Sequence, residues 1–360
     1  MSLNEGGTLS ILLDLATHLQ AVFDTRHVVY LINDRVASHF DGRRYECYSW
    51  PKASWANRLY FEKVFVKRIE QRLKPRLWLS LHDITASLRQ TPQLLYCHNP
   101  SPFLDRTVRL PVLDVKFALF VRFYEYLYRW GINRNKHVIV QQDWLRTEFL
   151  RRFHLDSSQV MVARPVSRCI SRTQPVIVGA FRKATAAAPL RLLYPALPRV
   201  FKNIEYLGEL AKLLADEPIE FSITISGDEN PYARFLWKNY AALGRIRFIG
   251  RQSRAALFDL YRHSDALIFP SHLETWGLPL SEFMQTGKPI LAADLPYARE
   301  VLSDYSAADL FSLDNVGACA QKIRKLAAGE FSPVDLRVDV AEPFCPDWNA
   351  FVQFIERLAP

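Results

Sequence analysis

Short apolar runs bounded by turn residues recur along the whole chain. Five lie in the first half, at residues 27–33, 76–81, 93–97, 137–141 and 160–163, and six lie in the second half, at residues 190–194, 221–225, 246–249, 266–269, 290–293 and 309–311. Each run has the length of a strand, and most are apolar at almost every position. That pattern is typical of parallel strands that are buried on both faces.

Between these runs, apolar residues recur with helical spacing. The spacing predicts helices over residues 10–23, 56–72, 114–130, 144–153, 204–215, 257–263, 317–327 and 347–358. Strands that alternate with helices indicate βαβ units, so the predicted fold is α/β with doubly wound, Rossmann-like parallel sheets.

The length of 360 residues suits two domains of ordinary size. Residues 171–189 show no clear periodicity and predict a linker. The domains are therefore expected at 1–170 and 190–340, with residues 341–360 holding a last amphipathic helix. No strand precedes the helical pattern of the first domain, so either its sheet lacks a first strand or the natural N-terminus has been trimmed.

One stretch, residues 266–302, contains the most informative spacing. Its strand ends at Pro270-Ser271, and a loop with Glu274 and Gly277 leads into a helix that carries Glu282. Pro279 stands at the first helical position, which proline tolerates well. This order forms one unit of a parallel sheet, and the carboxyl ends of such strands are where open sheets bind nucleotides and phosphates.

The chemistry of this stretch follows from a glycine between two carboxylates. Gly277 allows a ligand close to the backbone, and the N–H groups of Gly277, Leu278 and Leu280 are expected to be free at the helix start, where partial positive charge favours a pyrophosphate. Glu274 and Glu282 can accept hydrogen bonds from sugar hydroxyls. In the alternative interpretation, Glu282 only complements the helix dipole and Glu274 is a solvated loop residue.

The same stretch resembles the donor-sugar motif of retaining glycosyltransferases of family 4, which have the GT-B fold. The matching residues run from Pro270-Ser271 through Glu274-Thr275-Trp276-Gly277-Leu278-Pro279 and Glu282 to Gly287-Lys288-Pro289. The resemblance implies two Rossmann-like domains that face a cleft, with a nucleotide-diphosphate sugar held by Glu274, Trp276, Gly277, Leu278 and Glu282. It also implies that the C-terminal helix returns to the first domain.

Other site residues follow from the resemblance alone. It implies that Lys202, with Asn203 beside it, binds the diphosphate that leaves during the reaction. Arg199 is the candidate for the accompanying arginine, since the usual Gly-Arg is replaced here by Ala196-Leu197.

Three further positions have counterparts in the family. Gly7, in a glycine-rich loop, and His98, after a strand of the first domain, are expected to face the donor sugar. The loop with Gly250 and Arg251 is expected to hold the base. For His98 a purely structural hydrogen-bonding role is the alternative.

Composition narrows the setting of the protein. The chain is 49% apolar and 23% charged, as in globular proteins, and no apolar run reaches the roughly 20 residues that span a bilayer. The stretch 9–19 contains Asp14 and has no basic leader, so no signal peptide is expected. Five cysteines lie far apart without a Cys-x-x-Cys pair, which argues against disulfides and zinc and favours the reducing cytoplasm.

Charge is shared unevenly between the two halves. Residues 1–190 contain 28 Lys and Arg against 15 Asp and Glu, whereas residues 191–360 contain 18 against 22. No nucleic-acid-binding motif is present, so an anionic membrane surface or a lipid-linked acceptor suits the basic half better. The helix at 114–130 is rich in aromatic and basic residues, which is typical either of a packed core helix or of a helix at a lipid interface. The alternative is that the basic residues only maintain solubility.

The sequence therefore predicts a cytoplasmic enzyme, peripheral on the inner face of the membrane, that transfers a hexose to a saccharide or lipid-linked acceptor in polysaccharide biosynthesis. No Asp-x-Asp triplet is present, so neither a metal nor another cofactor is expected. A GT-B sugar-nucleotide epimerase and a catalytically degenerate sugar-nucleotide-binding protein are the alternatives.

Overall fold

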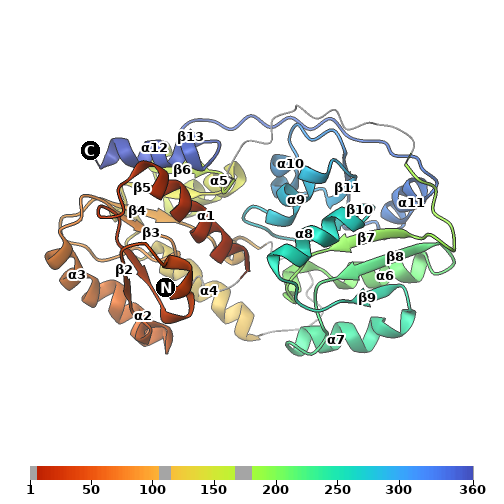
Figure 1. Ribbon diagram of the computed structural model, residues 1–360, viewed down its shortest axis with the longest axis horizontal. Coiled ribbons are helices and arrows are strands. Elements are labelled where there is room, and N and C mark those ends of the chain that lie inside the picture. The colour runs from red at the N-terminus through yellow and green to blue at the C-terminus, as the bar shows by residue number, and fades with distance from the viewer. Residues whose placement is uncertain (1–5, 105–114, 167–180, 360) are drawn as a thin grey trace. The chain divides into compact units, whose positions relative to one another are not determined.

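The computed structural model describes residues 6–104, 115–166 and 181–359, and the chain divides into two compact units (Figure 1). The N-terminal unit comprises Met1–Phe103, Val115–Cys169 and Val340–Pro360, and the C-terminal unit comprises Leu104–Asp114 and Ile170–Asp339. Most of the predicted linker, residues 171–180, lies outside the described residues. The last helix of the chain belongs to the N-terminal unit.

The N-terminal unit contains two parallel sheets. Its main sheet has the order β13-β6-β5-β4-β3, and a separate pair is formed by β1 and β2. Their bounds are β1 (Tyr30–Ile32), β2 (Tyr45–Cys47), β3 (Trp78–Ser80), β4 (Gln93–Tyr96), β5 (His137–Val140), β6 (Val160–Ala163) and β13 (Phe344–Cys345). The hydrophobic pattern predicts neither β2 nor β13, because β2 is partly exposed along its length and β13 has only two residues.

The helices of this unit are α1 (Gly6–Val22), α2 (Trp55–Tyr60), α3 (Val66–Leu73), α4 (Val115–Arg129), α5 (Asp143–Phe153) and α12 (Trp348–Leu358). Helix α12 packs against α1. The expected glycine-rich loop at Gly7 is wrong, because Gly7 lies inside α1 and is exposed. Residues 1–5 lie outside the described residues.

The helix predicted over 56–72 is not uniform. Between α2 and α3 the chain forms a π-helical turn, η3 (Phe61–Phe65), in which the Val66 N–H donates to the Phe61 carbonyl. This turn holds Lys63, whose Nζ donates to the carbonyl oxygens of Thr85 and Trp130 at 2.9 and 3.2 Å. Burial lowers the pKa of Lys63 to about 8.

The C-terminal unit is built on one six-stranded parallel sheet with the order β12-β11-β10-β7-β8-β9. Its strands are β7 (Leu190–Tyr194), β8 (Ile219–Ile223), β9 (Ile246–Phe248), β10 (Ala266–Phe269), β11 (Ile290–Ala293) and β12 (Ala308–Phe311). Every residue of β10, β11 and β12 is buried, as continuous apolar runs predict. The first strand of the unit lies beside the fourth, so the order of the strands reverses between β7 and β10.

The helices of this unit are α6 (Glu205–Leu213), α7 (Pro231–Tyr240), α8 (Arg254–His263), α9 (Leu278–Phe283), α10 (Pro296–Val301) and α11 (Val316–Ala327). Helix α6 packs against α7 and α11, and α9 packs against α10. The hydrophobic pattern predicts neither α7 nor α10. Both begin at a proline, which signals a turn in sequence but is compatible with the first helical position.

Gly208 allows α6 and α7 to approach closely, and this contact can be tested. A Cβ at Gly208 would lie 2.3 Å from the ring of Tyr240, which is buried. We expect Gly208→Ala to lower the free energy of unfolding by about 1–3 kcal/mol, measured by urea denaturation, because the added methyl overpacks the interface. Gly317→Ala is the control. Gly317 also lies in a helix, α11, but a Cβ added there would have no atom closer than 3.5 Å. Equal stability of the two variants would contradict this account.

Candidate functional site

A lysine and a glutamate form an ion pair at the point where the strand order of the C-terminal sheet reverses. Lys202 ends a short 3₁₀ helix, η7 (Val200–Lys202), in the loop after β7, and Glu274 lies in the loop after β10. Lys202 Nζ lies 2.5 Å from Glu274 Oε1, and the two side chains are only 15% and 11% exposed. Ligands of open α/β sheets bind at this edge and at such a reversal.

Two side chains behind the ion pair hold it in place. Ser271 Oγ donates to Glu274 Oε1 at 2.8 Å, and Tyr194 Oη lies 2.7 Å from Ser271 Oγ. Tyr194 also donates to the carbonyl of Lys202 at 2.7 Å. Burial raises the pKa of Tyr194, and the nearby Glu274 charge raises it further, so the hydroxyl stays neutral and can donate a hydrogen bond.

Tyr194 and Ser271 have no role predicted from the sequence. The only available signal was their position, since each stands at or just after the carboxyl end of a buried strand. Polar side chains at that place are the ones that can reach a site at the edge of the sheet.

Asn203 joins the two loops to each other. Its Nδ2 donates to the Pro270 carbonyl at 3.1 Å, and its backbone has a left-handed φ of 52°, which asparagine tolerates better than most residues. Nearby, the His272 N–H donates to the Phe201 carbonyl at 2.8 Å. Asn203 is buried, so in this structure it positions Lys202.

The start of α9 differs from the sequence expectation. Gly277 has a left-handed φ of 83°, and a Cβ there would lie 3.2 Å from Leu280 Cδ1, which explains the glycine. The Leu280 N–H is not free, because it donates to the Gly277 carbonyl at 2.8 Å. Leu278 is half-buried, and Trp276 is buried with its Nε1 donating to Ser281 Oγ at 3.1 Å.

Glu282 faces a hollow that neither Lys202 nor Glu274 lines. Its Oε2 accepts a hydrogen bond of 2.9 Å from Tyr261 Oη of α8. The hollow has a volume of about 310 Å³ and is lined by Phe258, Tyr261, Arg262, Glu282, Gln285, Thr286 and Lys288. The structure therefore gives the two glutamates of the motif different immediate partners.

The remaining predicted residues of this unit lie on its surface or in half-buried turns. The guanidinium of Arg199 is exposed and makes no hydrogen bond or ion pair with any described residue. Gly250 has a φ of 70° and follows β9, where its N–H donates to the Ile225 carbonyl at 3.0 Å. Arg251 beside it is exposed.

His98 lies at the carboxyl end of β4 in the N-terminal unit. Its Nδ1 is 3.2 Å from Gln141 Nε2, and its Nε2 has no partner among the described residues although the ring is buried. Burial lowers its pKa to about 4, so the ring is neutral at pH 7. The carboxylate of Asp83 fixes this loop by accepting from the N–H groups of His98 and Asn99 at 2.5 and 3.1 Å.

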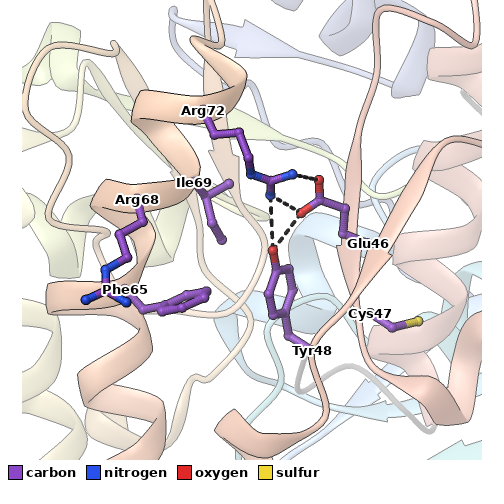
Figure 2. A pocket seen from close by; sticks show the side chains of 7 residues that line it. All are labelled: Glu46, Cys47, Tyr48, Phe65, Arg68, Ile69 and Arg72. Atoms are coloured by element: carbon purple, nitrogen blue, oxygen red, sulfur yellow. Dashed lines mark hydrogen bonds and ion pairs between the residues drawn. The ribbon is translucent and has the colours of Figure 1, made fainter.

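A second hollow, of about 580 Å³, lies in the N-terminal unit (Figure 2). It is lined by Glu46, Cys47, Tyr48, Phe65, Arg68, Ile69 and Arg72. Figure 2 shows that Arg72, Glu46 and Tyr48 all contact one another. The two terminal nitrogens of Arg72 donate to the Glu46 carboxylate at 2.8 and 2.6 Å, the Tyr48 hydroxyl donates to it at 2.6 Å, and Arg72 also donates to the Tyr48 Oη at 3.3 Å. None of the predicted site residues lines this hollow.

Three features of the described residues bear on the remaining expectations. They contain no group of three or more His, Cys, Asp or Glu side chains that could hold a metal ion. No described helix combines the length and apolar character needed to cross a bilayer. Four cysteines, Cys47, Cys97, Cys319 and Cys345, are free thiols, and Cys169 lies outside the described residues.

Comparison with known proteins identifies the family of the unit that holds the ion pair. The family model for glycosyl transferases group 1 matches residues 188–342. Over 205 residues the chain is 25% identical to O-antigen chain mannosyltransferase B of Escherichia coli. The aligned region covers 55% of this chain and 54% of that protein. The chain is 32% identical to the phosphatidyl-myo-inositol mannosyltransferase of Mycolicibacterium smegmatis over 117 residues, covering 32% and 29% of the two chains. The chain thus spans about half, or less, of the length of these relatives.

Solved structures show the fold over nearly the whole chain. Sucrose-phosphate synthase from Thermosynechococcus elongatus superimposes with a TM-score of 0.65 at 16% identity, over 98% of this chain and 90% of that one. The lipopolysaccharide outer core galactosyltransferase WaaB gives 0.63 at 14% identity, over 99% and 92%. The predicted GT-B fold is confirmed. Residues 188–342 therefore belong to the glycosyl transferases group 1 family, within a chain that has the GT-B fold.

Proposed function

We propose that this protein is a retaining, metal-independent glycosyltransferase of family 4. It transfers a hexose from a nucleotide-diphosphate sugar to a saccharide or lipid-linked saccharide acceptor. The observation that carries the proposal is the ion pair of Lys202 and Glu274 at the strand reversal of a group 1 domain. The names of the relatives, which include O-antigen mannosyltransferases, support a role in cell-surface polysaccharide biosynthesis. We also propose that the enzyme is cytoplasmic and acts at the inner face of the membrane.

The ion pair supplies a chemical role for each partner. In the absence of donor the two charges neutralise each other in a site that excludes most water. We infer that a bound diphosphate draws the Lys202 ammonium toward its oxygens, which frees the Glu274 carboxylate to accept hydrogen bonds from hydroxyls of the transferred sugar. Charge that develops on the leaving phosphate is then stabilised by a cation already in place.

The other residues are assigned smaller parts in the same proposal. Glu282 lines its own hollow and can accept hydrogen bonds from ribose hydroxyls when Tyr261 gives up its bond. Arg199 is exposed in the same loop as Lys202, so it is the candidate for a second phosphate contact. The His98 ring is neutral, and its buried Nε2 has no hydrogen-bond partner among the described residues. It can therefore form a hydrogen bond with a sugar hydroxyl without adding charge to the site.

Donor binding and nucleotide release test the proposal together. A panel of nucleotide sugars is screened by thermal shift, because a ligand that binds only the folded state raises its melting temperature. Release of nucleoside diphosphate is then followed with and without a saccharide acceptor. Acceptor-dependent release supports a transferase, release without acceptor supports an epimerase-like reaction, and binding without any release supports a degenerate binding protein.

A glutamate variant separates donor binding from chemistry. We expect Glu282→Ala to raise the KM for the donor about tenfold while kcat changes little, because a ribose contact is shared by the ground state and the transition state. The measurement is steady-state nucleotide release across donor concentrations. Glu209→Ala, which removes an exposed carboxylate from α6, is the control. An unchanged KM in Glu282→Ala would remove Glu282 from the donor site.

A further inference from the structure

Helix α4 presents two opposite kinds of surface. On one side Tyr124, Leu127 and Tyr128 are at most 5% exposed and belong to the core of the N-terminal unit. On the other side large apolar residues recur at helical spacing and remain exposed. These are Leu119 at 64%, Phe123 at 37%, Tyr126 at 64% and Trp130, just after the helix, at 46%. The aromatic helix predicted from the sequence is therefore a core helix with an apolar outer stripe.

The neighbouring helical segment extends this stripe. Trp55, at the start of α2, is 39% exposed and its ring lies 5.4 Å from that of Phe123. Lys63 of η3 places its Nζ 4.5 Å from the centre of the Trp130 ring. Two contacts along the pair of helices hold α2 and η3 beside α4. We call the surface formed by Trp55, Leu119, Phe123, Tyr126 and Trp130 the aromatic surface.

Positive charges outnumber negative ones on the helical segments that form the aromatic surface. Residues 55–74 carry six Lys and Arg and two Glu, and both glutamates are buried, Glu62 at 1% exposed and Glu70 at 6%. Glu62 Oε1 lies 2.7 Å from His82 Nε2, and Glu70 binds backbone N–H groups. On α4 itself Arg122 is exposed. Most of the charged side chains on these segments are therefore cations, although Arg72 is paired with Glu46, and Glu125 of α4, which is 25% exposed, is paired with Arg129.

Tryptophan and tyrosine side chains beside lysine and arginine are typical of the surface of a bilayer. The tryptophan and tyrosine rings favour the headgroup level, where the apolar part of the ring meets the acyl chains and its polar group stays hydrated. Anionic lipids attract the surrounding cations within a Debye length. A protein interface would be expected to bury the aromatic residues with fewer charged neighbours, since charge is depleted at the centre of such interfaces.

We propose that the aromatic surface docks the protein on an anionic bilayer. The inference deepens the proposed function, on which it rests for the lipid-linked acceptor, by naming the surface that brings the N-terminal unit to the lipid. Trp55, Phe123, Tyr126 and Trp130 enter the headgroup region, while Lys67 and Arg122 contact lipid phosphates. Attachment is peripheral and reversible, as for other amphipathic surfaces.

Vesicle sedimentation of the full chain tests the inference. One set of vesicles is phosphatidylcholine alone and the other is phosphatidylcholine mixed with phosphatidylglycerol. We expect binding to the mixed vesicles, little binding to the neutral ones, and release at high NaCl concentration. Leu119→Ser with Tyr126→Ser should weaken binding at least about tenfold, because the two most exposed apolar side chains are lost. The control, Leu213→Ser with Val334→Ser, changes exposed apolar residues of the C-terminal unit and should bind like the wild type.

A second variant keeps the test independent of folding. Lys67→Gln with Arg122→Gln removes the charge from one half-buried and one exposed side chain, and it should reduce binding to the mixed vesicles while the melting temperature stays unchanged. Equal sedimentation of the wild type and both test variants overturns the inference. A concentration-dependent dimer that the Leu119→Ser, Tyr126→Ser variant loses, without vesicle binding, also overturns it and assigns the surface to a second copy of the chain. Donor turnover with a soluble acceptor should be unchanged in both variants, so this test and that of the proposed function can fail separately.

Discussion

Replacing Lys202 by alanine should reduce kcat for donor turnover about 100-fold or more, with a small change in KM. The lysine ammonium lies 2.5 Å from the Glu274 carboxylate in a site that excludes most water. Its electrostatic effect on a departing phosphate is therefore screened less than that of a surface lysine. The loss of one preorganised contact of this kind typically costs about 2–4 kcal/mol of transition-state stabilisation. The measurement is nucleoside diphosphate release at saturating donor and acceptor.

A matched lysine on the surface provides the control. Lys212 pairs with Glu209 at 2.9 Å, but its side chain is 50% exposed on α6. Lys212→Ala should leave kcat unchanged. Lys202→Arg keeps the charge in a different shape and should retain part of the rate. If Lys202→Ala turned over at the wild-type rate while remaining folded, Lys202 would have no role in the reaction.

Replacing Glu70 by glutamine should destabilise the N-terminal unit by about 3 kcal/mol at pH 7. Burial raises the pKa of Glu70, but hydrogen bonds from the N–H groups of Gln90, Thr91 and Arg89 outweigh it and lower the pKa from 4.5 to about 2. The bonds measure 3.0, 2.9 and 2.7 Å. Each tenfold change in the acid dissociation constant corresponds to about 1.36 kcal/mol of preference for the ionised form in the folded state.

The dependence on pH gives this prediction its sign. Because the folded-state pKa is depressed, the contribution of Glu70 is complete above about pH 5 and is lost as pH falls from 4.5 toward 2. The stability gap between the wild type and Glu70→Gln should therefore narrow across that window, as measured by urea denaturation at several pH values. Glu209→Gln changes an exposed carboxylate and should follow the wild type. A gap that stays constant down to pH 2 would show that the ionised carboxylate is not the source of the stability.

The sequence predicted the strands of the C-terminal unit well. Strands β7, β10 and β11 have the predicted bounds, because a strand buried on both faces must be apolar throughout and therefore stands out locally. The predictions were poorer for β2, with three partly exposed residues, and for α7 and α10, whose first residue is a proline. In these elements local signals were weak or pointed to a turn.

Local spacing in the sequence was sufficient to predict those candidate site residues that follow the same strand. Glu274, Gly277 and Glu282 belong to one strand-loop-helix unit, and the structure places them in that order. The expectation of a free Leu280 N–H was wrong, since the first turn of α9 closes on the Gly277 carbonyl. The roles proposed for Lys202, Glu274 and Glu282 remain predictions, and the experiments above test those of Lys202 and Glu282.

The sequence by itself determined the alternation of strands and helices, the family of residues 188–342 and the positive charge of the N-terminal half, since each depends on local spacing or on composition. Only the tertiary structure decided that Lys202 lies against Glu274, 72 residues away, with Tyr194 and Ser271 behind the pair. It also decided that Glu282 faces Tyr261 and that one stripe of α4 stays exposed. Such contacts depend on the order of strands in the sheet and on the packing of helices, and both are set by interactions between residues far apart in the chain.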